Sequence, residues 1–307
     1  MSTIAILLST YNGQKYLRQQ LDSLLHQKDV EVKIIVRDDG SNDNTPLILK
    51  EYAEKHSNIT LLLESNIGVE ASFSRLVKYA FKETLCDYYA FADQDDVWFD
   101  NKLSCSIKAI EGQSGPALFC CNQIVTDSEL NHLFLMIPSD DYEELVNRMN
   151  SNYFVNRHGC TMVWNMRLQE VLGCMTRHLN IIPTHDVWTM LVARCSGEVT
   201  IGKAPLQLYR VHNKNTSGLE RNRFKRLKKG INLYLLRNNN RDMYAKECLS
   251  LLSKYGKNDS GAEYVRKVAR YKMNFINRIR LMFSKQIWEG KKPDSILFAL
   301  SVLMGKY

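Results

Sequence analysis

Short hydrophobic runs and helical segments alternate along the first hundred residues of the chain. Mainly apolar runs occupy residues 4–9, 32–37, 59–64 and 88–92. Between them, apolar side chains recur every three or four residues, as over residues 16–25, which is typical of a helix that packs one face on a sheet. This alternation predicts an α/β fold in which the strands form a mostly parallel central sheet.

The pattern changes beyond residue 100. A predicted helix at 102–110 and a predicted strand at 117–122 are followed by a loop and a further helix. Mixed segments continue until basic helical patterns without clear strands replace them. We therefore expect an α/β domain over residues 1–218 and a basic helical C-terminal extension over residues 219–307.

Polar loops follow all four predicted strands. They read STYNG, RDDGSND, ESNIGVE and DQDD in chain order. Each alone is typical of a solvent-exposed turn, and the second leads into Thr45 and Pro46, which predict a helix start with Thr45 as its N-cap. The carboxyl ends of parallel strands meet at one edge of a sheet, where ligands bind in open α/β folds, so the four loops together favour a binding site.

The fourth loop carries three carboxylates in four positions. Asp93, Asp95 and Asp96 stand within FADQDDVW, between apolar residues. Like charges this close repel one another, and burying each costs roughly several kcal/mol unless a cation compensates. An acidic turn in solvent is the alternative. The apolar flanks favour a buried cluster that binds a cation.

Composition and charge divide the chain into two electrostatic parts. The 307 residues are 45% hydrophobic, which allows a sizeable core, and the net charge is +8. Residues 203–307 hold 24 Lys and Arg against 7 Asp and Glu, whereas residues 1–202 hold 17 against 26. A basic extension on an acidic body suits an anionic surface, either a membrane or a nucleic acid.

Cysteine usage and hydropathy bear on the compartment. The eight cysteines form no C-x-x-C pair, and the first residues lack the charged start and apolar run of a signal peptide. No apolar stretch approaches the roughly 18 to 20 residues of a membrane-spanning helix. We expect a reduced, cytoplasmic protein, either in solution or peripheral on the inner face of the cell membrane.

Seven stretches in a fixed order carry a family resemblance. They read STYNGQKYL, VRDDGSNDNT, SNIGVEASF, FADQDDVWFDNKL, GCTMVWN, HDVW and YRVHNKNT, and they fall within residues 3–218. Together they resemble the family 2 glycosyltransferases, and among these the bacterial rhamnosyltransferase-like branch. The resemblance implies a GT-A-type nucleotide-diphospho-sugar transferase domain that transfers a sugar with inversion. The basic extension lies outside it.

Within this resemblance, DQD matches the family's DxD motif. The match implies Asp95 as the direct metal ligand, Asp93 near the ribose or the metal, and Mn²⁺ or Mg²⁺ as the cofactor. Asp96 either binds the metal or orients its ligands from behind. A cation that neutralises the diphosphate of a sugar nucleotide would also explain why the carboxylate cluster is tolerated.

The loops after the first two strands match the family's nucleotide-binding part. The resemblance places Thr10 and Tyr11 beside the base and Asn12 among the nucleotide-binding residues, with Asp39 accepting the imide N–H of uracil or thymine and Asp38 bracing the turn. An Asx-rich turn that caps the next helix is the alternative. The expected donor is a UDP- or dTDP-sugar, with dTDP-rhamnose among the candidates.

Two later stretches supply the remaining candidate residues. THDVW matches a two-residue acidic motif of the family, which implies Asp186 as the general base, with His185 beside it at a position where a carboxylate often stands. Capping of a helix over 187–194 is the alternative. In YRVHNKNT, Arg210 and His212 either bind the diphosphate as part of a lid or are solvated loop residues.

These features predict an inverting, metal-dependent, non-processive glycosyltransferase that acts on a hydroxyl of a lipid-linked surface polysaccharide. A Q-x-x-R-W signature, which would suggest processive synthesis, is absent from the chain. A sugar nucleotidyltransferase is one alternative, but it would need a Gly-rich basic loop after the first strand, and STYNGQKYL has none. A non-catalytic glycan- or nucleotide-sugar-binding protein is the other.

The basic extension contains two charged segments. RNRFKRLKKG places six basic residues in nine positions, and NFINRIRLMFSKQIW sets apolar residues at helical spacing between Arg and Lys. The second segment predicts a basic amphipathic helix suited to an anionic membrane surface, with packing on the catalytic domain as the alternative. No recognisable nucleic-acid-binding module accompanies the charge, so we expect no nucleic-acid partner.

Overall fold

The computed structural model describes residues 1–175, 184–212, 240–289 and 292–307. The chain divides into two compact units, one formed by Met1–Tyr142 and Arg157–His212, the other by Glu143–Asn156 and Asn213–Tyr307. The predicted boundary at residue 218 lies outside the described residues. The segment 143–156, which we expected in the first domain, groups with the C-terminal helices instead.

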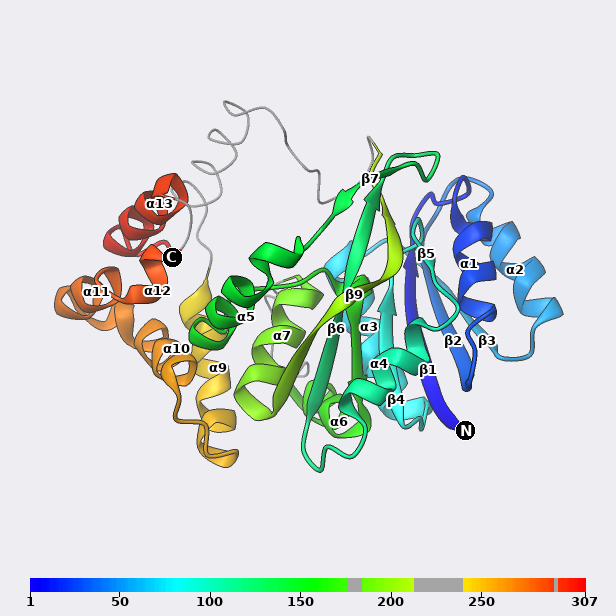
Figure 1. Cartoon of the computed structure of the whole chain (residues 1–307). Helices are drawn as coiled ribbons and strands as arrows, with labels where there is room; N and C mark the ends of the chain where they lie inside the picture. Colours follow the sequence, from blue (N-terminus) through cyan, green and yellow to red (C-terminus); the bar gives the residue numbers. More distant parts are fainter. Residues whose placement is uncertain (176–183, 213–239, 290–291) are drawn as a thin grey trace. The chain divides into compact units, whose positions relative to one another are not determined.

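A mixed sheet forms the centre of the first unit (Figure 1). Its strands are β1 (Ser2–Thr10), β2 (Val30–Asp39), β3 (Ile59–Glu64), β4 (Tyr88–Ala92), β5 (Val97–Trp98), β6 (Ala117–Thr126), β7 (His132–Leu135), β8 (Met162–Asn165) and β9 (Glu198–Arg210). They lie in the order β3-β2-β1-β4-β8-β6-β9-β5, with β7 paired to β6. The strands β1 to β4 run parallel, and β8 joins them to β6 through antiparallel pairs.

Helices cover both faces of this sheet. α1 (Leu17–Leu25), α2 (Thr45–Lys55) and α4 (Lys102–Ile110) pack on one face, and α3 (Val69–Glu83), α6 (Met166–Met175) and α7 (His185–Ser196) on the other. Ile4, Ile6 and Leu8 of β1 share one apolar cluster with Leu21 of α1 and Leu49 of α2. Each such side chain contributes roughly 1.5–3 kcal/mol on burial. The predicted α/β fold is thus confirmed.

The predicted elements of the first hundred residues agree with the structure. All four predicted strands lie within β1 to β4, and the predicted helix at 102–110 is α4. One local prediction is wrong, because α2 is capped at Asn44 and begins at Thr45. The Thr45 hydroxyl oxygen accepts the N–H of Gly13 at 2.8 Å and so joins the loop after β1 to α2.

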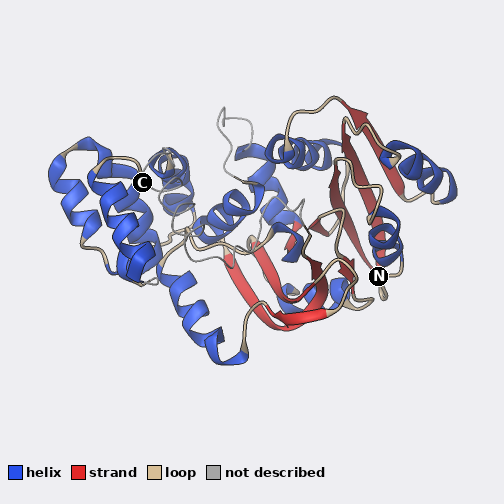
Figure 2. Cartoon of the chain, turned by 90° about the horizontal axis from the view of Figure 1, so that it is seen from above, coloured by secondary structure: helices blue, strands red, loops and turns tan. Residues whose placement is uncertain are grey.

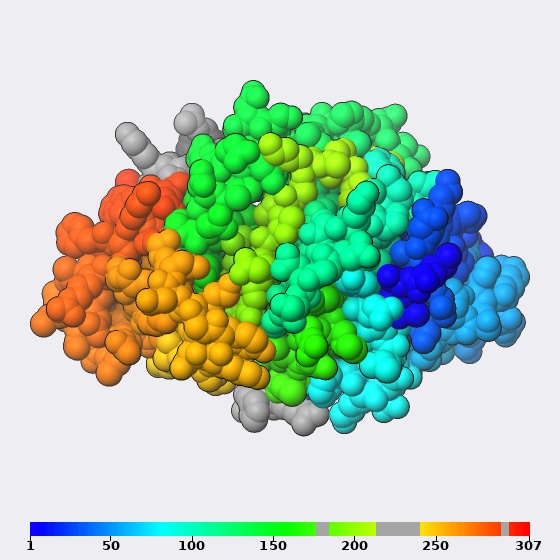
Figure 3. Space-filling model, turned by 60° about the horizontal axis from the view of Figure 1, so that its bottom comes forward, coloured from blue at the N-terminus to red at the C-terminus, as the bar shows by residue number. Residues whose placement is uncertain are grey.

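The two edges of the parallel strands differ in character. At their amino ends, the N–H and the hydroxyl of Thr3 both donate to Asp87 Oδ2 at 2.8 Å. Figure 3 shows this side, with the first residues in dark blue beside the cyan segment that precedes β4. The carboxyl ends carry the polar loops, so the candidate site lies at the other edge.

Helices make up the regular structure of the second unit's described residues (Figure 2). They are α5 (Tyr142–Ser151), α9 (Arg241–Lys254), α10 (Ser260–Arg270), α11 (Phe275–Met282), α12 (Lys285–Trp288) and α13 (Lys292–Leu303). A short 3-10 turn lies at Tyr271–Met273 in this unit, while those at Ser139–Asp141 and Gly159–Thr161 belong to the first unit. No helix in the described ranges is long and apolar enough to cross a membrane.

Side-chain hydrogen bonds attach the α5 segment to the C-terminal helices. The Tyr153 hydroxyl donates to Asp259 Oδ2 at 2.6 Å, and the Ser151 hydroxyl donates to Glu289 Oε2 at 2.8 Å. The predicted helical extension is therefore present for the residues described. Its segment RNRFKRLKKG falls outside them.

The prediction of one continuous helix over residues 274–288 is wrong. α11 ends at Met282, and α12 begins at Lys285. The Trp288 indole N–H donates to the Met282 carbonyl at 2.8 Å, so a side chain satisfies a backbone oxygen at the break. Apolar spacing continues across the break, which is why periodicity alone did not reveal it.

Candidate active site

Asp38 connects the ends of β1 and β2. The Thr10 hydroxyl donates to Asp38 Oδ1 at 2.9 Å, while the N–H and the hydroxyl of Ser41 donate at 2.9 and 2.6 Å. Asp38 is buried, with 2% of its surface exposed. The structure thus brings together Thr10 and Asp38, two of the predicted nucleotide-binding residues.

Asp39 faces the opposite side of the strand, as successive strand residues do. It accepts a hydrogen bond from Arg37 Nη1 at 2.5 Å and from the N–H groups of Ile67 and Gly68 at 2.8 and 2.9 Å. Because these two N–H groups stand at the start of α3, Asp39 fastens that helix to β2. Of the two aspartates, Asp38 is the one that faces the loop after β1.

The loops after β1 and β4 are held together by Gln94, which sequence reasoning missed. Its amide exchanges two hydrogen bonds with the backbone of Tyr11, at 2.8 and 3.1 Å. A Cβ on Gly13 would lie 2.2 Å from Gln94 Oε1, so this approach requires glycine. Asn12 binds the loop after β2, because its N–H donates to Ser41 Oγ at 2.8 Å.

The three aspartates after β4 differ in burial. Asp93 is half-buried, the Asp95 side chain is 15% exposed and Asp96 is fully buried. Burial, reinforced by the charge of Asp95, raises the pKa of Asp93 to about 7 and that of Asp96 well above its usual range. The surroundings therefore do not compensate the negative charge of these carboxylates, as expected of a site that binds a cation.

Asp95 and His212 meet at the open side of this cluster. Asp95 Oδ2 lies 2.8 Å from His212 Nε2, and the imidazole lies against the Tyr16 ring, with 5.0 Å between centroids. Sequence reasoning named Asp95 and His212 separately, for the metal and for the diphosphate. The structure places the carboxylate and the imidazole side by side.

Arg210 is buried in the wall of the site. Its guanidinium donates to the carbonyl oxygens of Asp95 and Ser128 at 2.8 and 2.5 Å and to Gln19 Oε1 at 2.6 Å, and it lies over the Tyr16 ring. Only 2% of its surface is exposed. This placement does not match the lid that we expected, and diphosphate binding by Arg210 stays a prediction.

Asp186 stands in the first turn of α7. Its Oδ1 accepts the N–H of Val187 at 2.7 Å, whereas Thr184, at the N-cap, makes no side-chain capping bond. The ring of His185, the residue before Asp186, lies 4.9 Å from that of Phe91 near the end of β4 and also lies against Gly159, next to Cys160, so the start of α7 lies beside the aspartate cluster. The structure therefore brings the predicted base to the predicted metal site.

The His185 ring packs against two phenylalanine rings. Its ring stacks on Phe73 with 3.8 Å between centroids and meets Phe91 edge-on at 4.9 Å. Its Nε2 is buried without a hydrogen-bond partner among the described residues, and burial lowers the pKa of the imidazole. A Cβ on Gly159 would lie 2.2 Å from this nitrogen. The surroundings favour a neutral, packed ring.

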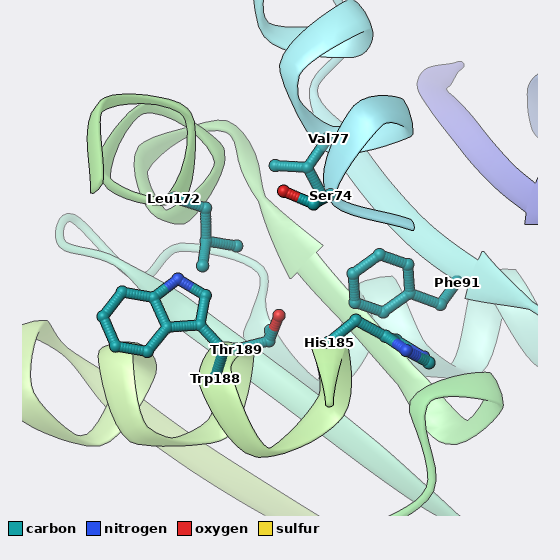
Figure 4. A pocket seen from close by; sticks show the side chains of 7 residues that line it. All are labelled: Ser74, Val77, Phe91, Leu172, His185, Trp188 and Thr189. Atoms are coloured by element: carbon teal, nitrogen blue, oxygen red, sulfur yellow. The ribbon is translucent and has the colours of Figure 1, made fainter. Parts of the chain in front are cut away.

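A small pocket lies behind His185, between α3, β4, α6 and α7 (Figure 4). Its lining is largely apolar and contains no acidic or permanently charged side chain: Ser74, Val77, Phe91, Leu172, His185, Trp188 and Thr189. A diphosphate needs cationic partners. The pocket is therefore part of the support for α7 rather than a site for the nucleotide.

Sequence reasoning also missed a buried polar chain behind the aspartates. The Lys102 ammonium donates to Gln207 Oε1 at 2.5 Å and to the Cys160 carbonyl at 2.6 Å, and Gln207 Nε2 lies 3.4 Å from Asp96 Oδ2. Burial lowers the pKa of Lys102 to about 8. The available signal was its position on the apolar face of α4, shared with residues 103, 106, 107 and 110.

The donor set of the site suits a hard cation at its open side. Ligand atoms of Asp93, Asp96 and Cys160 lie within 4.8 Å of one another. Burial raises the pKa of the Cys160 thiol well above its usual range, so this sulfur stays protonated and is a poor ligand. Asp96 is enclosed, which leaves the Asp93 and Asp95 carboxylates as the accessible oxygen donors that Mg²⁺ or Mn²⁺ prefers.

Comparison with known proteins gives one family match. Residues 5–172 match the model of glycosyl transferase family 2. A dTDP-rhamnosyl transferase, RfbG of Shigella flexneri, is 37% identical over 106 residues, which are 34% of this chain and 36% of that protein. An uncharacterized glycosyltransferase of Rickettsia typhi is 25% identical over 190 residues, 60% of this chain and 57% of that protein. The chain thus matches less than two thirds of either relative's length.

Solved structures share the fold at low sequence identity. The Staphylococcus aureus TarS fragment 1–349 with UDP-GlcNAc is 15% identical, with a TM-score of 0.54 over 99% of this chain and 93% of that one. The mannosyltransferase PcManGT from Pyrobaculum calidifontis, with GDP-Man and Mn²⁺, is 14% identical, with a TM-score of 0.55 over 99% and 88%. Both likenesses concern the fold.

Proposed function

The chain belongs to glycosyl transferase family 2 and is an enzyme of that family, and we propose that it performs an inverting, non-processive transfer from a nucleotide-diphosphate sugar to a hydroxyl group. The contact between the start of α7 and the end of β4 supports this proposal most, because it joins a candidate base on α7 to a candidate cation site after β4. An in-line displacement needs a base that takes the proton of the entering oxygen and a cation that stabilises the leaving group.

In this proposal, Asp186 takes the proton of the acceptor hydroxyl while that oxygen bonds to the anomeric carbon. The bond from this carbon to the diphosphate oxygen breaks in the same step, and the nucleoside diphosphate leaves with the electron pair. We assign His185 to the support of Asp186, since its ring is enclosed by Phe73 and Phe91.

We assign the binding of Mn²⁺ or Mg²⁺ to Asp93 and Asp95, with His212 beside Asp95. Carboxylate oxygens suit both ions, and a bound cation would neutralise charge on the departing diphosphate. The PcManGT structure contains Mn²⁺, which is consistent with a cation in this fold. We assign Asp96, which is fully buried, to the orientation of these residues.

The proposed donor is a UDP- or dTDP-sugar, with dTDP-rhamnose among the candidates. Thr10, Tyr11 and Asn12 would line the base. We now favour Asp38 over Asp39 as acceptor of the imide N–H, because Asp38 accepts the Thr10 hydroxyl next to the loop after β1, whereas Asp39 faces Arg37 and the start of α3. The names of the Shigella relative and of the TarS complex both contain a pyrimidine nucleotide, which is consistent with this choice.

The proposed acceptor is a surface polysaccharide on a lipid carrier, met at an anionic membrane surface on the inner face of the cell membrane. Exposed apolar side chains on and beside α11 and α12 support this: Phe275, Ile276, Phe283 and Trp288 are 66, 62, 71 and 48% exposed. Arg280 and Lys285 are exposed among them. Aromatic and basic side chains together suit the interface of an anionic bilayer.

A panel of sugar nucleotides tests the reaction. We expect slow release of UDP or dTDP from one or a few donors, dependent on Mn²⁺ or Mg²⁺ and faster once an acceptor glycan is added. The release should stop with a chelator and in the variant Asp95→Ala. Release of pyrophosphate from a nucleoside triphosphate and a sugar phosphate, or no cation-dependent turnover of any donor, would contradict the proposal.

A further inference from the structure

A buried lysine lies directly behind the aspartate cluster. Lys102 has no exposed surface, and its ammonium lies 3.2 Å from the centroid of the Trp98 ring in addition to its two hydrogen bonds. Burying an ammonium costs roughly several kcal/mol unless opposite charge and hydrogen bonds compensate. The proposed reaction has no direct use for this group, so its place in the core calls for a separate explanation.

Gln207 connects Lys102 to the cluster. Its oxygen accepts from the ammonium, so its NH₂ group points the other way, 3.4 Å from Asp96 Oδ2 and 3.2 Å from Cys160 Sγ. The reverse orientation would set the Gln207 NH₂ group against the Lys102 ammonium, which has no acceptor atom. The charge of Lys102 therefore determines which end of Gln207 faces Asp96.

Asp96 in turn holds two parts of the site together. Its other oxygen accepts the N–H of Arg210, at the end of β9, at 3.2 Å. Asp95 precedes Asp96 directly, and His212 follows Arg210 by two residues. The orientation of Asp96 therefore affects the contact between Asp95 Oδ2 and His212 Nε2, which lie 2.8 Å apart.

We propose that Lys102 and Gln207 are positioning residues, which orient Asp96 and so keep Asp95 and His212 in the geometry that binds the divalent cation. This inference rests on the proposed function only for the identity of the cation site. Groups behind the direct ligands of a metal commonly change its affinity by about 10- to 100-fold.

The test is a Mn²⁺ titration of the nucleotide-free protein. We expect Lys102→Met and Gln207→Met each to weaken Mn²⁺ binding by about tenfold or more. The double variant should lie within about twofold of the weaker single variant, because both changes interrupt the same chain of hydrogen bonds. Lys203→Met removes an exposed lysine from the same strand as Gln207 and should bind Mn²⁺ as the wild type does.

Two results would overturn the proposal. One is unchanged Mn²⁺ affinity in the folded single variants, even with lower thermal stability, because that pattern denotes packing alone. The other is losses that add in the double variant. If Lys102→Met does not fold, Gln207→Met, which keeps the ammonium, decides the question. A wild type that binds no Mn²⁺ refutes the cation site itself, whereas a wild type that binds Mn²⁺ but turns over no donor refutes only the proposed reaction.

Discussion

At the scale of single residues, the carboxylates of the site are stabilised in two different ways. Asp38 and Asp39 are buried, but each accepts three hydrogen bonds from neighbouring protein groups. Burial, together with the charge of the neighbouring Asp95, instead raises the pKa of Asp93 to about 7. The hydrogen bonds to Asp38 and Asp39 support the binding loops, whereas the repulsion between Asp93 and its neighbours is relieved when a cation binds.

The raised pKa of Asp93 predicts how cation binding depends on pH. Below about pH 7 the cation must displace a proton from Asp93, so the apparent Mn²⁺ affinity should rise about tenfold from pH 5.5 to 6.5 and level off above pH 8. Without the cation, the folded protein holds this proton between pH 4 and 7 while the unfolded chain does not, so stability should fall as pH rises through that window.

Calorimetric Mn²⁺ titrations and metal-free melting curves across this range check both expectations. Asp93→Asn should abolish Asp93's contribution to the slope of stability against pH. The variant His212→Gln has no imidazole, so any pH dependence of Mn²⁺ binding that it keeps does not come from His212. A wild-type affinity independent of pH between 5.5 and 7.5 would show that Asp93 does not exchange its proton for the cation.

The contacts of His185 with Phe73 and Phe91 predict that the imidazole ring matters for packing and not for proton transfer. His185→Phe, of similar shape, should keep the turnover rate of folded protein within about threefold, with any crowding at Gly159 costing stability only. His185→Ala should lose about 2–5 kcal/mol of stability through the cavity it leaves. A drop of a hundredfold in turnover for folded His185→Phe would instead make His185 a catalytic residue.

The residues that sequence reasoning missed are those defined by distant partners. Lys102 and Gln207 are 105 positions apart, and nothing in either local sequence predicts their hydrogen bond. Within the family resemblance, Arg210 was expected either in a lid over the diphosphate or in a solvated loop, and the fold instead surrounds its guanidinium with oxygen acceptors. Asp95 and Asp186, in contrast, were indicated by motifs whose chemistry requires those residue types.

At the scale of elements, local pattern predicted strands well and helix ends less well. Strands β1, β2 and β4 are largely buried on both faces, so their apolar runs stand out from the helices between them, whereas the edge strand β3 is partly exposed. The segment 274–288 keeps its apolar spacing across the break between α11 and α12, so its two helices were predicted as one. Of its apolar residues, Leu281 and Ile287 are buried and Phe275 and Ile276 exposed.

The exposed residues of α11 predict binding to an anionic membrane. Ile276 lies in α11, and Phe283 directly follows the last residue of that helix, with the exposed Arg280 between them. We expect salt-sensitive binding to phosphatidylglycerol vesicles, weak binding to phosphatidylcholine vesicles, and loss of both with Ile276→Glu and Phe283→Glu combined. Vesicle sedimentation at low and high salt measures this.

A matched control comes from the first unit. Leu133 and Phe134 of β7 are 45 and 38% exposed, so Leu133→Glu with Phe134→Glu removes a comparable apolar pair elsewhere. This variant should bind vesicles as the wild type does. Equal binding of the wild type to both lipids, or undiminished binding by the α11 variant, would rule out α11 as the membrane surface.

At the scale of the whole molecule, the order of motifs predicted the α/β unit, and the change in charge predicted a separate C-terminal part. What the sequence did not show is that residues 143–156 group with that part. Their attachment depends on bonds such as Tyr153 to Asp259, more than a hundred positions apart. The site of the first unit, by comparison, is built from loops that follow neighbouring strands.

The central claim is that Asp186 is the base of a transfer whose donor is held by the cation site. Single-turnover measurement of Asp186→Asn, with the donor that the wild type uses, tests it most directly. We predict donor affinity within about threefold of the wild type and a transfer rate from bound donor that is at least a hundredfold lower, the usual scale for a positioned base. Weakened donor binding with an unchanged rate of transfer from the bound donor would contradict the account and make Asp186 a structural residue.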